Sequence, residues 1–187
     1  LGHYSLDQLP AESRDRWVVR VADLYENDPT SAIHGASGWL LRQWGRGKEV
    51  ERVDQKPVAY DPSGEREWYT VAIPVNTETS TFLYFTFVVL PPGEYQLGSR
   101  EGDADRQGNE AMFRVHLTLS VAVCDRELTW QAYDVLDQSQ MREKWQHQFN
   151  RELTDRDPVF GVNWYEAITY CRYLSNQAGL PETAQCY

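Results

Sequence analysis

The feature that most constrains this chain is an unbroken run of apolar and aromatic residues from Thr81 to Leu90. Such a run is typical of a β-strand that is covered on both faces. Its alternate residues form two apolar faces, with Leu83, Phe85, Phe87 and Val89 on one and Phe82, Tyr84, Val88 and Leu90 on the other. Two apolar faces need two covering layers, so we expect helices to pack on both sides of this strand.

Further strands are expected on either side of this run. Residues Trp68–Val75 predict one strand. Pro92-Gly93 marks a turn, because Pro lacks a ladder donor and Gly permits positive φ, and a second short strand then ends at Gly98-Ser99. Arg100–Glu110 is a polar loop. Apolar and polar residues alternate from Phe113 to Val123, which predicts one half-exposed strand.

Residues 1 to about 48 predict two helices. The first carries one apolar stripe, Trp17, Val18, Val21, Leu24 and Tyr25. Asp28-Pro29 ends it. The second carries the stripe Ile33, Ala36, Ser37, Leu40, Leu41 and Trp44, with Ser31 as the expected cap and Gly45 as the expected stop. Gly35 and Gly38 each weaken this helix by ~1 kcal/mol relative to Ala, so we expect a helix contact or a bend to compensate.

The charged segment 46–66 shows no periodicity and is expected to be a linker or surface loop. Helices return after the strands. Thr129 is expected to cap a helix that runs through Asp137 and buries Trp130, Tyr133 and Leu136, and residues 139–150 are a further helical candidate.

The last helix has the clearest start. Asn163 is followed three residues later by Glu166, which is the arrangement of a capping box. Its predicted core face comprises Trp164, Ala167, Ile168, Cys171, Leu174, Ser175 and Ala178, and Gly179-Leu180-Pro181 ends it. On this register, Trp164 is a core residue whose loss would cost ~3–5 kcal/mol.

Charge and composition exclude several classes of protein. The chain has 187 residues and a net charge of −10, which argues against a nucleic-acid or anionic-membrane partner. No apolar run approaches the ~20 residues that span a bilayer. The first residue is Leu, so we expect a processed form or an excised piece. Three scattered Cys form neither a disulfide framework nor a metal motif.

Motifs for known chemistry fail on inspection. Asp103-x-Asp105 begins like a calcium loop, but Arg114 stands where a bidentate Glu is needed. Gly35-Ala36-Ser37-Gly38 lies on a predicted helix instead of the strand-to-helix turn of a nucleophile elbow. Gly47-Lys48 lacks the earlier Gly of a phosphate loop. We therefore assign no catalytic, cofactor-binding or metal residue.

The histidines are expected to be surface residues or to be satisfied by hydrogen bonds, and the cysteines to be reduced thiols. The four histidines, His3, His34, His116 and His147, lie far apart and none has a Cys or Glu at ligand spacing. Cys171 is placed on the apolar face of the last helix, where burial would raise the pKa of its thiol, so packing is favoured over nucleophilic catalysis. Cys186 near the C-terminus lacks any partner in the sequence.

Two segments carry a family resemblance. The order Val89-Leu90-Pro91-Pro92-Gly93-Glu94-Tyr95-Gln96-Leu97-Gly98-Ser99 resembles the hairpin that opens domains of the formylglycine-generating-enzyme (sulfatase-modifying factor) family. The stretch Asp157-Pro158-Val159-Phe160-Gly161-Val162-Asn163-Trp164-Tyr165-Glu166-Ala167-Ile168-Thr169-Tyr170-Cys171 is similar to a helix start later in such domains. Residues 25–45 are similar to a helical lead-in that precedes such domains in some large multidomain bacterial proteins.

The resemblance covers about residues 86–187, the first half of such a domain. It implies a C-type-lectin-like fold and an enzyme that uses copper(I) and oxygen to oxidise a substrate cysteine to formylglycine. The family's cysteine pair lies beyond Gln185-Cys186-Tyr187, so no catalytic residue carries over and no cofactor is expected in this chain. Leu97, Phe113 and Glu127-Leu128-Thr129 depart from the family pattern and put substrate details in doubt more than the fold.

Together these patterns predict an α+β fold with residues 1–66 as helical lead-in and linker and residues 67–187 as the N-terminal part of the family domain. The expected function is part of a sulfatase-modifying-factor-type protein. The alternative is a non-catalytic binding or structural domain of a larger bacterial protein, because a fold does not fix a function. Expected partners are a protein or peptide substrate and the rest of the parent chain or a partner chain, with no nucleic acid and no membrane, and the expected location is cytoplasmic.

Overall fold

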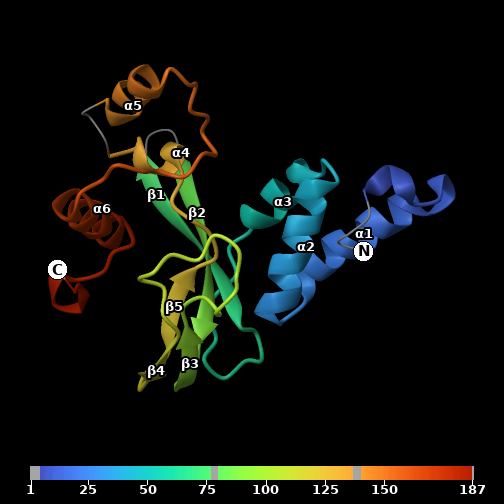
Figure 1. Cartoon of the computed structure of the whole chain (residues 1–187), viewed down its shortest axis with the longest axis horizontal. Coiled ribbons are helices and arrows are strands. Elements are labelled where there is room, and N and C mark those ends of the chain that lie inside the picture. The colour runs from blue at the N-terminus through green and yellow to red at the C-terminus, as the bar shows by residue number, and fades with distance from the viewer. Residues whose placement is uncertain (1–4, 77–79, 137–139, 187) are drawn as a thin grey trace.

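The computed structural model describes residues 5–76, 80–136 and 140–186. The elements follow in the order η1 (Leu6–Gln8), α1 (Ala11–Asn27), α2 (Ser31–Gln43), α3 (Gly47–Asp54), β1 (Trp68–Asn76), β2 (Thr81–Leu90), β3 (Gly93–Leu97), β4 (Phe113–Leu117), β5 (Val121–Cys124), α4 (Trp130–Tyr133), α5 (Met141–Phe149), α6 (Trp164–Gln177) and η2 (Glu182–Ala184). Helices α1–α3 stand on one side of the strands and α6 on the other, with α4 and α5 at one end of β1 and β2 (Figure 1). The predicted α+β class is confirmed. His3 and Asp137 lie outside the described residues.

The central sheet has three antiparallel strands in the order β1-β2-β5. The predicted strand Thr81–Leu90 is confirmed as β2, and Trp68–Val75 forms nearly all of β1. One face turns Trp68 toward the lead-in helices, where its indole Nε1 donates to the carbonyl of Asp28 at 2.9 Å. The opposite face carries Val71 and Phe85, which are register partners and turn toward α6.

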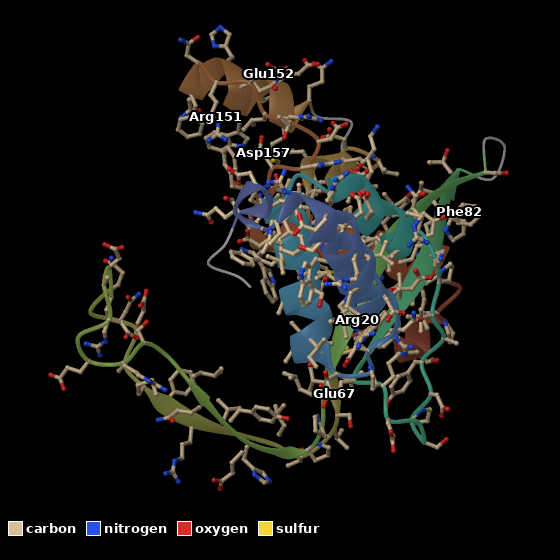
Figure 2. All side chains as sticks on the ribbon, turned by 90° about the vertical axis from the view of Figure 1, so that its right-hand side faces the viewer. Arg20, Glu67, Phe82, Arg151, Glu152 and Asp157 are labelled. Atoms are coloured by element: carbon tan, nitrogen blue, oxygen red, sulfur yellow. The ribbon has the colours of Figure 1, made fainter. Side chains whose placement is uncertain are left out.

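The single strand predicted over Phe113–Val123 is wrong, because the structure has two strands there. β4 pairs with β3 and β5 pairs with β2, each antiparallel. The register pairs Leu90 with Val121 and Gly93 with Leu117, so Pro91-Pro92 stands opposite residues 118–120. Proline offers no N–H to the ladder, so the opposing chain has no partner there and bends. The β3–β4 hairpin consequently leaves the body of the molecule (Figure 2).

The lead-in helices bury one shared core. Val18, Val21 and Tyr25 of α1 pack with Leu41 and its neighbours, as the first predicted stripe required. The second stripe is partly wrong, because Ile33 and Ala36 are exposed and His34 is buried in their place. Ser37, Leu40, Leu41 and Trp44 are buried as predicted. The helix begins at Ser31, so its cap is Thr30 instead of Ser31.

The predicted linker 46–66 contains a helix. α3 begins at Gly47 with Arg46 as its cap, shortly after Gly45, whose φ of +70° follows the end of α2. Its only buried residues are Val50 and Val53. Two apolar positions on a two-turn helix give too short a pattern to stand out among the charged residues around them. The charged side chains remain on the surface, where Arg52 pairs with Glu26 of α1 at 3.0 Å.

The C-terminal helices bury less than the sequence predicts. α4 spans only Trp130–Tyr133, although Trp130 and Tyr133 are buried as expected. The capping box of α6 is confirmed, since the Asn163 side chain accepts from the backbone of Tyr165 and Glu166 at 2.9 and 3.1 Å. The predicted core face of α6 is partly wrong, although Leu174 packs against the buried cluster of Trp130 and Tyr170. Trp164 is 64% exposed, Cys171 and Ala178 are exposed, and the buried residue of the helix is Tyr170.

Candidate functional site

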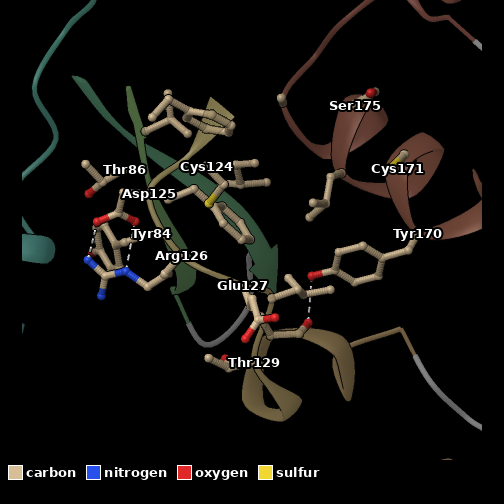
Figure 3. Close-up of a pocket in the computed structure, with 18 of the residues that line it drawn as sticks. Tyr84, Thr86, Cys124, Asp125, Arg126, Glu127, Thr129, Tyr170, Cys171 and Ser175 are labelled. Atoms are coloured by element: carbon tan, nitrogen blue, oxygen red, sulfur yellow. Dashed lines mark hydrogen bonds and ion pairs between the residues drawn. The ribbon is translucent and has the colours of Figure 1, made fainter. Parts of the chain in front are cut away.

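The predicted core face of α6 borders an apolar cleft of about 530 Å³. The sheet forms one wall, with Val71 and Ile73 from β1 and Phe85 and Phe87 from β2. Helix α6 forms the other wall with residues that lie on one face of the helix over about two turns, Tyr170, Cys171, Leu174, Ser175 and Ala178. Figure 3 shows the two walls facing each other across open space. A cleft of this volume is in the range of known ligand sites.

The cleft is apolar because the sheet turns its apolar face toward it. Among the ten residues of β2, all of them described, only Thr86 is buried. Thr86 faces the lead-in helices and shares a hydrogen bond with Thr70 at 3.1 Å. Phe85 and Phe87 on the opposite face stay half-buried because α4 and α6 leave part of that face uncovered. The lead-in layer expected from the sequence is therefore present, and the second layer covers the sheet only in part.

The charged edge of the cleft follows β5. The Arg126 guanidinium pairs with Asp125 and with Asp54 of α3, each at 2.8 Å. Burial opposes the charge of Arg126, but the hydrogen bond to Asp125 and the charge of Asp54 together raise its pKa above the usual value. The next residue, Glu127, also lines the cleft, and no described residue forms an ion pair or hydrogen bond with its exposed side chain.

The lead-in is joined to this edge through one polar network. The Tyr25 hydroxyl donates to Asp54 and lies 3.4 Å from Arg126. Burial, followed by the charge of Asp54, raises the pKa of Tyr25. The His34 ring stacks between Tyr25 at 4.2 Å and Trp68 at 3.8 Å. Residues from α1, α2, α3, β1 and the loop after β5 are thus fixed to one another.

The described histidines form no metal or catalytic site. His116 and His147 are exposed, so the surface reading of these two is confirmed. His34 is 2% exposed and its Nδ1 lies 2.7 Å from the Tyr25 carbonyl, so it is a buried structural residue. Within the described ranges, no group of three or more His, Cys, Asp or Glu side chains could hold a metal ion.

Two cysteines line the cleft from opposite walls. Cys124 of β5 is half-buried, and burial raises the pKa of its thiol. Cys171 of α6 is exposed, which corrects the predicted burial of its side chain. Figure 3 shows Cys124 on the sheet side and Cys171 on the helix side. Cys186 is exposed and lies outside the cleft lining. The structure therefore provides no paired thiols at this site.

Comparison with protein families decides the kinship of the chain. The family model described as "Sulfatase-modifying factor enzyme 1-like domain" matches residues 74–186. The chain belongs to this family. The match begins in β1 and takes in the remaining strands, α6 and the cleft lining except Val71 and Ile73, whereas α1–α3 lie before it. No curated protein and no solved structure matches the chain.

The copper of the family's reaction does not fit the described residues. Copper(I) favours two soft thiolate ligands. Cys124 and Cys171 stand on opposite walls, and the raised pKa of Cys124 favours the protonated thiol that binds metal poorly.

The described residues also contain no helix long and apolar enough to cross a membrane. The main features of the site are its apolar walls and its charged edge.

Sequence reasoning found the walls of the cleft but not its edge. Phe85, Phe87, Cys171 and Leu174 were all placed on apolar faces. Asp54 lies in the segment predicted as a linker, Arg126 was assigned to no element, and the two are 72 positions apart, so no local pattern could bring them together. An ion pair between residues so far apart in the sequence leaves no periodic signal.

Proposed function

We propose that this chain acts as a binding module of the sulfatase-modifying-factor family, in which the apolar cleft between the sheet and α6 receives another molecule. The observation that carries this proposal is the cleft itself, about 530 Å³ and lined mainly by apolar side chains. Binding an apolar partner to walls of this kind is favourable, by about 25 cal/mol for each Å² of apolar surface that is removed from water. This is the non-catalytic alternative that the sequence left open.

The family's oxidation of a substrate cysteine is the second candidate, and the family match supports it. In a complete domain, copper would supply the redox chemistry with oxygen as oxidant. The described residues do not fit copper, so the contribution of this chain to such a reaction would be to bind a protein or peptide. Its own residues would then position the partner through the cleft walls and leave the oxidation to other groups.

A cleft-filling variant tests the binding role. Ser175→Trp places an indole in the cleft from the α6 wall, because Ser175 lines it. Arg172→Trp adds the same indole at an exposed position of the same helix that does not line the cleft. A neutral hydrophobic dye should fluoresce with the wild type and with Arg172→Trp, and lose most of its signal with Ser175→Trp at an unchanged melting temperature. Equal dye binding by all three proteins would overturn the proposal.

An oxidation assay tests the second candidate. A cysteine-containing sulfatase-type peptide is incubated with the chain, copper(I) and oxygen, and its mass is followed. We expect no formylglycine above a control without protein, because the described residues offer no copper site. Product formation above that control would show that this chain carries the reaction itself, and the binding-module proposal would have to give way.

A further inference from the structure

The walls of the cleft are short, which limits the size of a ligand. On the sheet, the lining takes in Val71 and Ile73 of β1 and residues 84–87 of β2. Three steps along a strand cover about 10 Å. On α6 the lining runs from Tyr170 to Ala178, and this stretch of helix covers about 12 Å. Together with the volume of about 530 Å³, these lengths fit a compact molecule of one or two rings.

The helical wall is anchored beside the cleft. The Tyr170 hydroxyl donates to the carbonyl of Ala132 at 2.8 Å, and the Tyr133 and Tyr170 rings lie 5.4 Å apart between centroids. Both tyrosines are buried, so these contacts fix α6 relative to α4. Binding to walls that are already in place costs less free energy than binding to walls that must first be ordered.

The charged edge disfavours an anionic ligand. Arg126 is the cation among the lining residues, and its guanidinium is paired with Asp125 and Asp54, each at 2.8 Å. An anion at the edge would have to compete with both carboxylates. The Glu127 carboxylate, in contrast, forms no ion pair or hydrogen bond with any described residue. A negative charge without a partner, next to apolar walls, attracts a cation.

The sheet wall suits the same kind of ligand. Phe85 and Phe87 line the cleft with their ring centroids 6.5 Å apart. Aromatic rings offer a large apolar contact area, and the face of a ring also attracts a cation within about 6 Å. An apolar body that carries one positive charge therefore matches both the walls and the edge.

We infer that the cleft binds a small hydrophobic amine, whose apolar body lies between the sheet and α6 and whose ammonium group pairs with Glu127. This inference rests on the proposed binding function of the cleft. The apolar body would supply most of the affinity, and the Glu127 pair would select the cation. Because Glu127 is exposed, its pair with the amine changes affinity only several-fold.

Three compounds with the same two-ring body provide the probe. Diphenylpropylamine is a cation at neutral pH, diphenylpropanol is neutral and diphenylpropanoate is an anion. Their dissociation constants are measured by titration calorimetry on the whole chain. We expect the wild type to bind the amine most tightly and the carboxylate most weakly, with about fivefold between neighbours in this series. Equal affinities, or tightest binding of the carboxylate, would overturn the inference.

Two charge-matched variants separate Glu127 from the general acidity of the chain. Glu127→Gln and Glu152→Gln each remove one negative charge, but Glu152 is exposed and lies outside the cleft lining (Figure 2). In Glu127→Gln the preference for the amine over the alcohol should fall about threefold or more, and the carboxylate should bind more tightly than it does to the wild type. Glu152→Gln should keep the wild-type series. An equal fall in both variants, or in neither, would overturn the role of Glu127.

Alkylation of cysteines shows where the amine binds. Cys171 lines the cleft and is exposed, and Cys186 is exposed outside it, so one chain contains both the reporter and its control. Saturating diphenylpropylamine should slow alkylation of Cys171 severalfold and leave Cys186 unchanged. Protection of neither thiol would place the amine elsewhere and overturn the inference.

The outcomes also separate the two proposals. Dye binding that is lost in Ser175→Trp, together with no preference for the amine, would retain the binding module and reject the hydrophobic amine. Absence of both dye and amine binding would reject both proposals. A dimer in sedimentation that Ser175→Trp dissolves would identify a second copy as the occupant and overturn the small ligand.

Discussion

At the scale of the residue, His34 is the group that ties stability to pH. Its Nδ1 faces the Tyr25 carbonyl at 2.7 Å, and because a carbonyl only accepts, the proton of the neutral ring is on Nδ1. The buried Nε2 has no hydrogen-bond partner among the described residues. Burial lowers the pKa of His34, although the hydrogen bond to Tyr25 opposes part of this effect. A proton on Nε2 would create a buried N–H without an acceptor.

The sign of the pH dependence follows from this lowered pKa. In the unfolded chain His34 titrates near its ordinary pKa of about 6.5. As the pH falls below that value, the unfolded state takes up a proton before the folded state does, so the free energy of unfolding falls. The stabilisation is therefore complete above about pH 6.5 and is lost toward the lower folded-state pKa. Urea melts between about pH 7.5 and about pH 5 measure it.

A ring-preserving variant tests this assignment. His34→Phe retains an aromatic ring between Tyr25 and Trp68 but cannot titrate, so the fall in stability over this pH range should flatten. His147→Phe changes an exposed histidine and should leave the slope as in the wild type. A slope that persists in His34→Phe would assign the proton uptake to another group.

The start of α6 contains a second prediction at the residue scale. Asn163 caps two backbone N–H groups, and its own N–H donates to Glu166 at 2.7 Å. Asn163→Ala should cost about 1 kcal/mol. Trp164→Ala should cost less than the ~3–5 kcal/mol of a buried Trp, because this side chain is 64% exposed. Chemical melts of both variants measure the two costs, and a Trp164→Ala cost above about 3 kcal/mol would show that the indole is buried after all.

At the scale of the element, two glycines of α2 should respond in opposite ways to alanine. A Cβ at Gly35 would meet nothing within 4 Å, so Gly35→Ala should stabilise the protein by about 1 kcal/mol through helix propensity. A Cβ at Gly38 would lie 2.6 Å from Cε2 of Tyr25. That ring is held by its stacking on His34, so Gly38→Ala should destabilise by about 1–3 kcal/mol. Thermal melts that move in the same direction for both variants would contradict this packing of α1 on α2.

The elements also show which sequence signals sufficed. Strand β2 could be predicted to the residue, because a ten-residue segment that is apolar except for Thr81 and Thr86 and is bounded by Pro91-Pro92 leaves few other assignments. The break between β4 and β5 could not, because alternation continues through residues 118–120 and the cause lies in the opposing chain. The walls of the cleft were likewise identified as apolar. The amino-acid composition of a face is the same whether it packs in a core or borders a cleft. The cleft itself could therefore not be predicted from the sequence.

At the scale of the whole molecule, the lead-in helices act as one covering layer of the sheet. Trp68 is buried against His34, and the N–H of Glu67 donates to the carbonyl of Pro29 at 2.8 Å. On the far side of the sheet, α4 and α6 form a separate core around Trp130 and Tyr170. Neither core includes a strand residue, and the sheet meets the lead-in helices where Trp68 stacks on His34. The predicted boundary between residues 1–66 and 67–187 therefore cuts through a packed interface.

The last prediction is that residues 67–187 do not fold independently. Removing residues 1–66 would expose Trp68 and the face of the sheet that carries Thr70 and Thr86. Losing the burial of one Trp alone costs about 3–5 kcal/mol. Since domains are stable by only about 5–15 kcal/mol, the shortened chain should lose its cooperative melt. A chain lacking only residues 1–10 loses the short turn η1 and should keep that melt at a slightly lower temperature. A cooperative melt of residues 67–187 would instead show that the family domain stands without its lead-in, and that the interface through Trp68 contributes little to its stability.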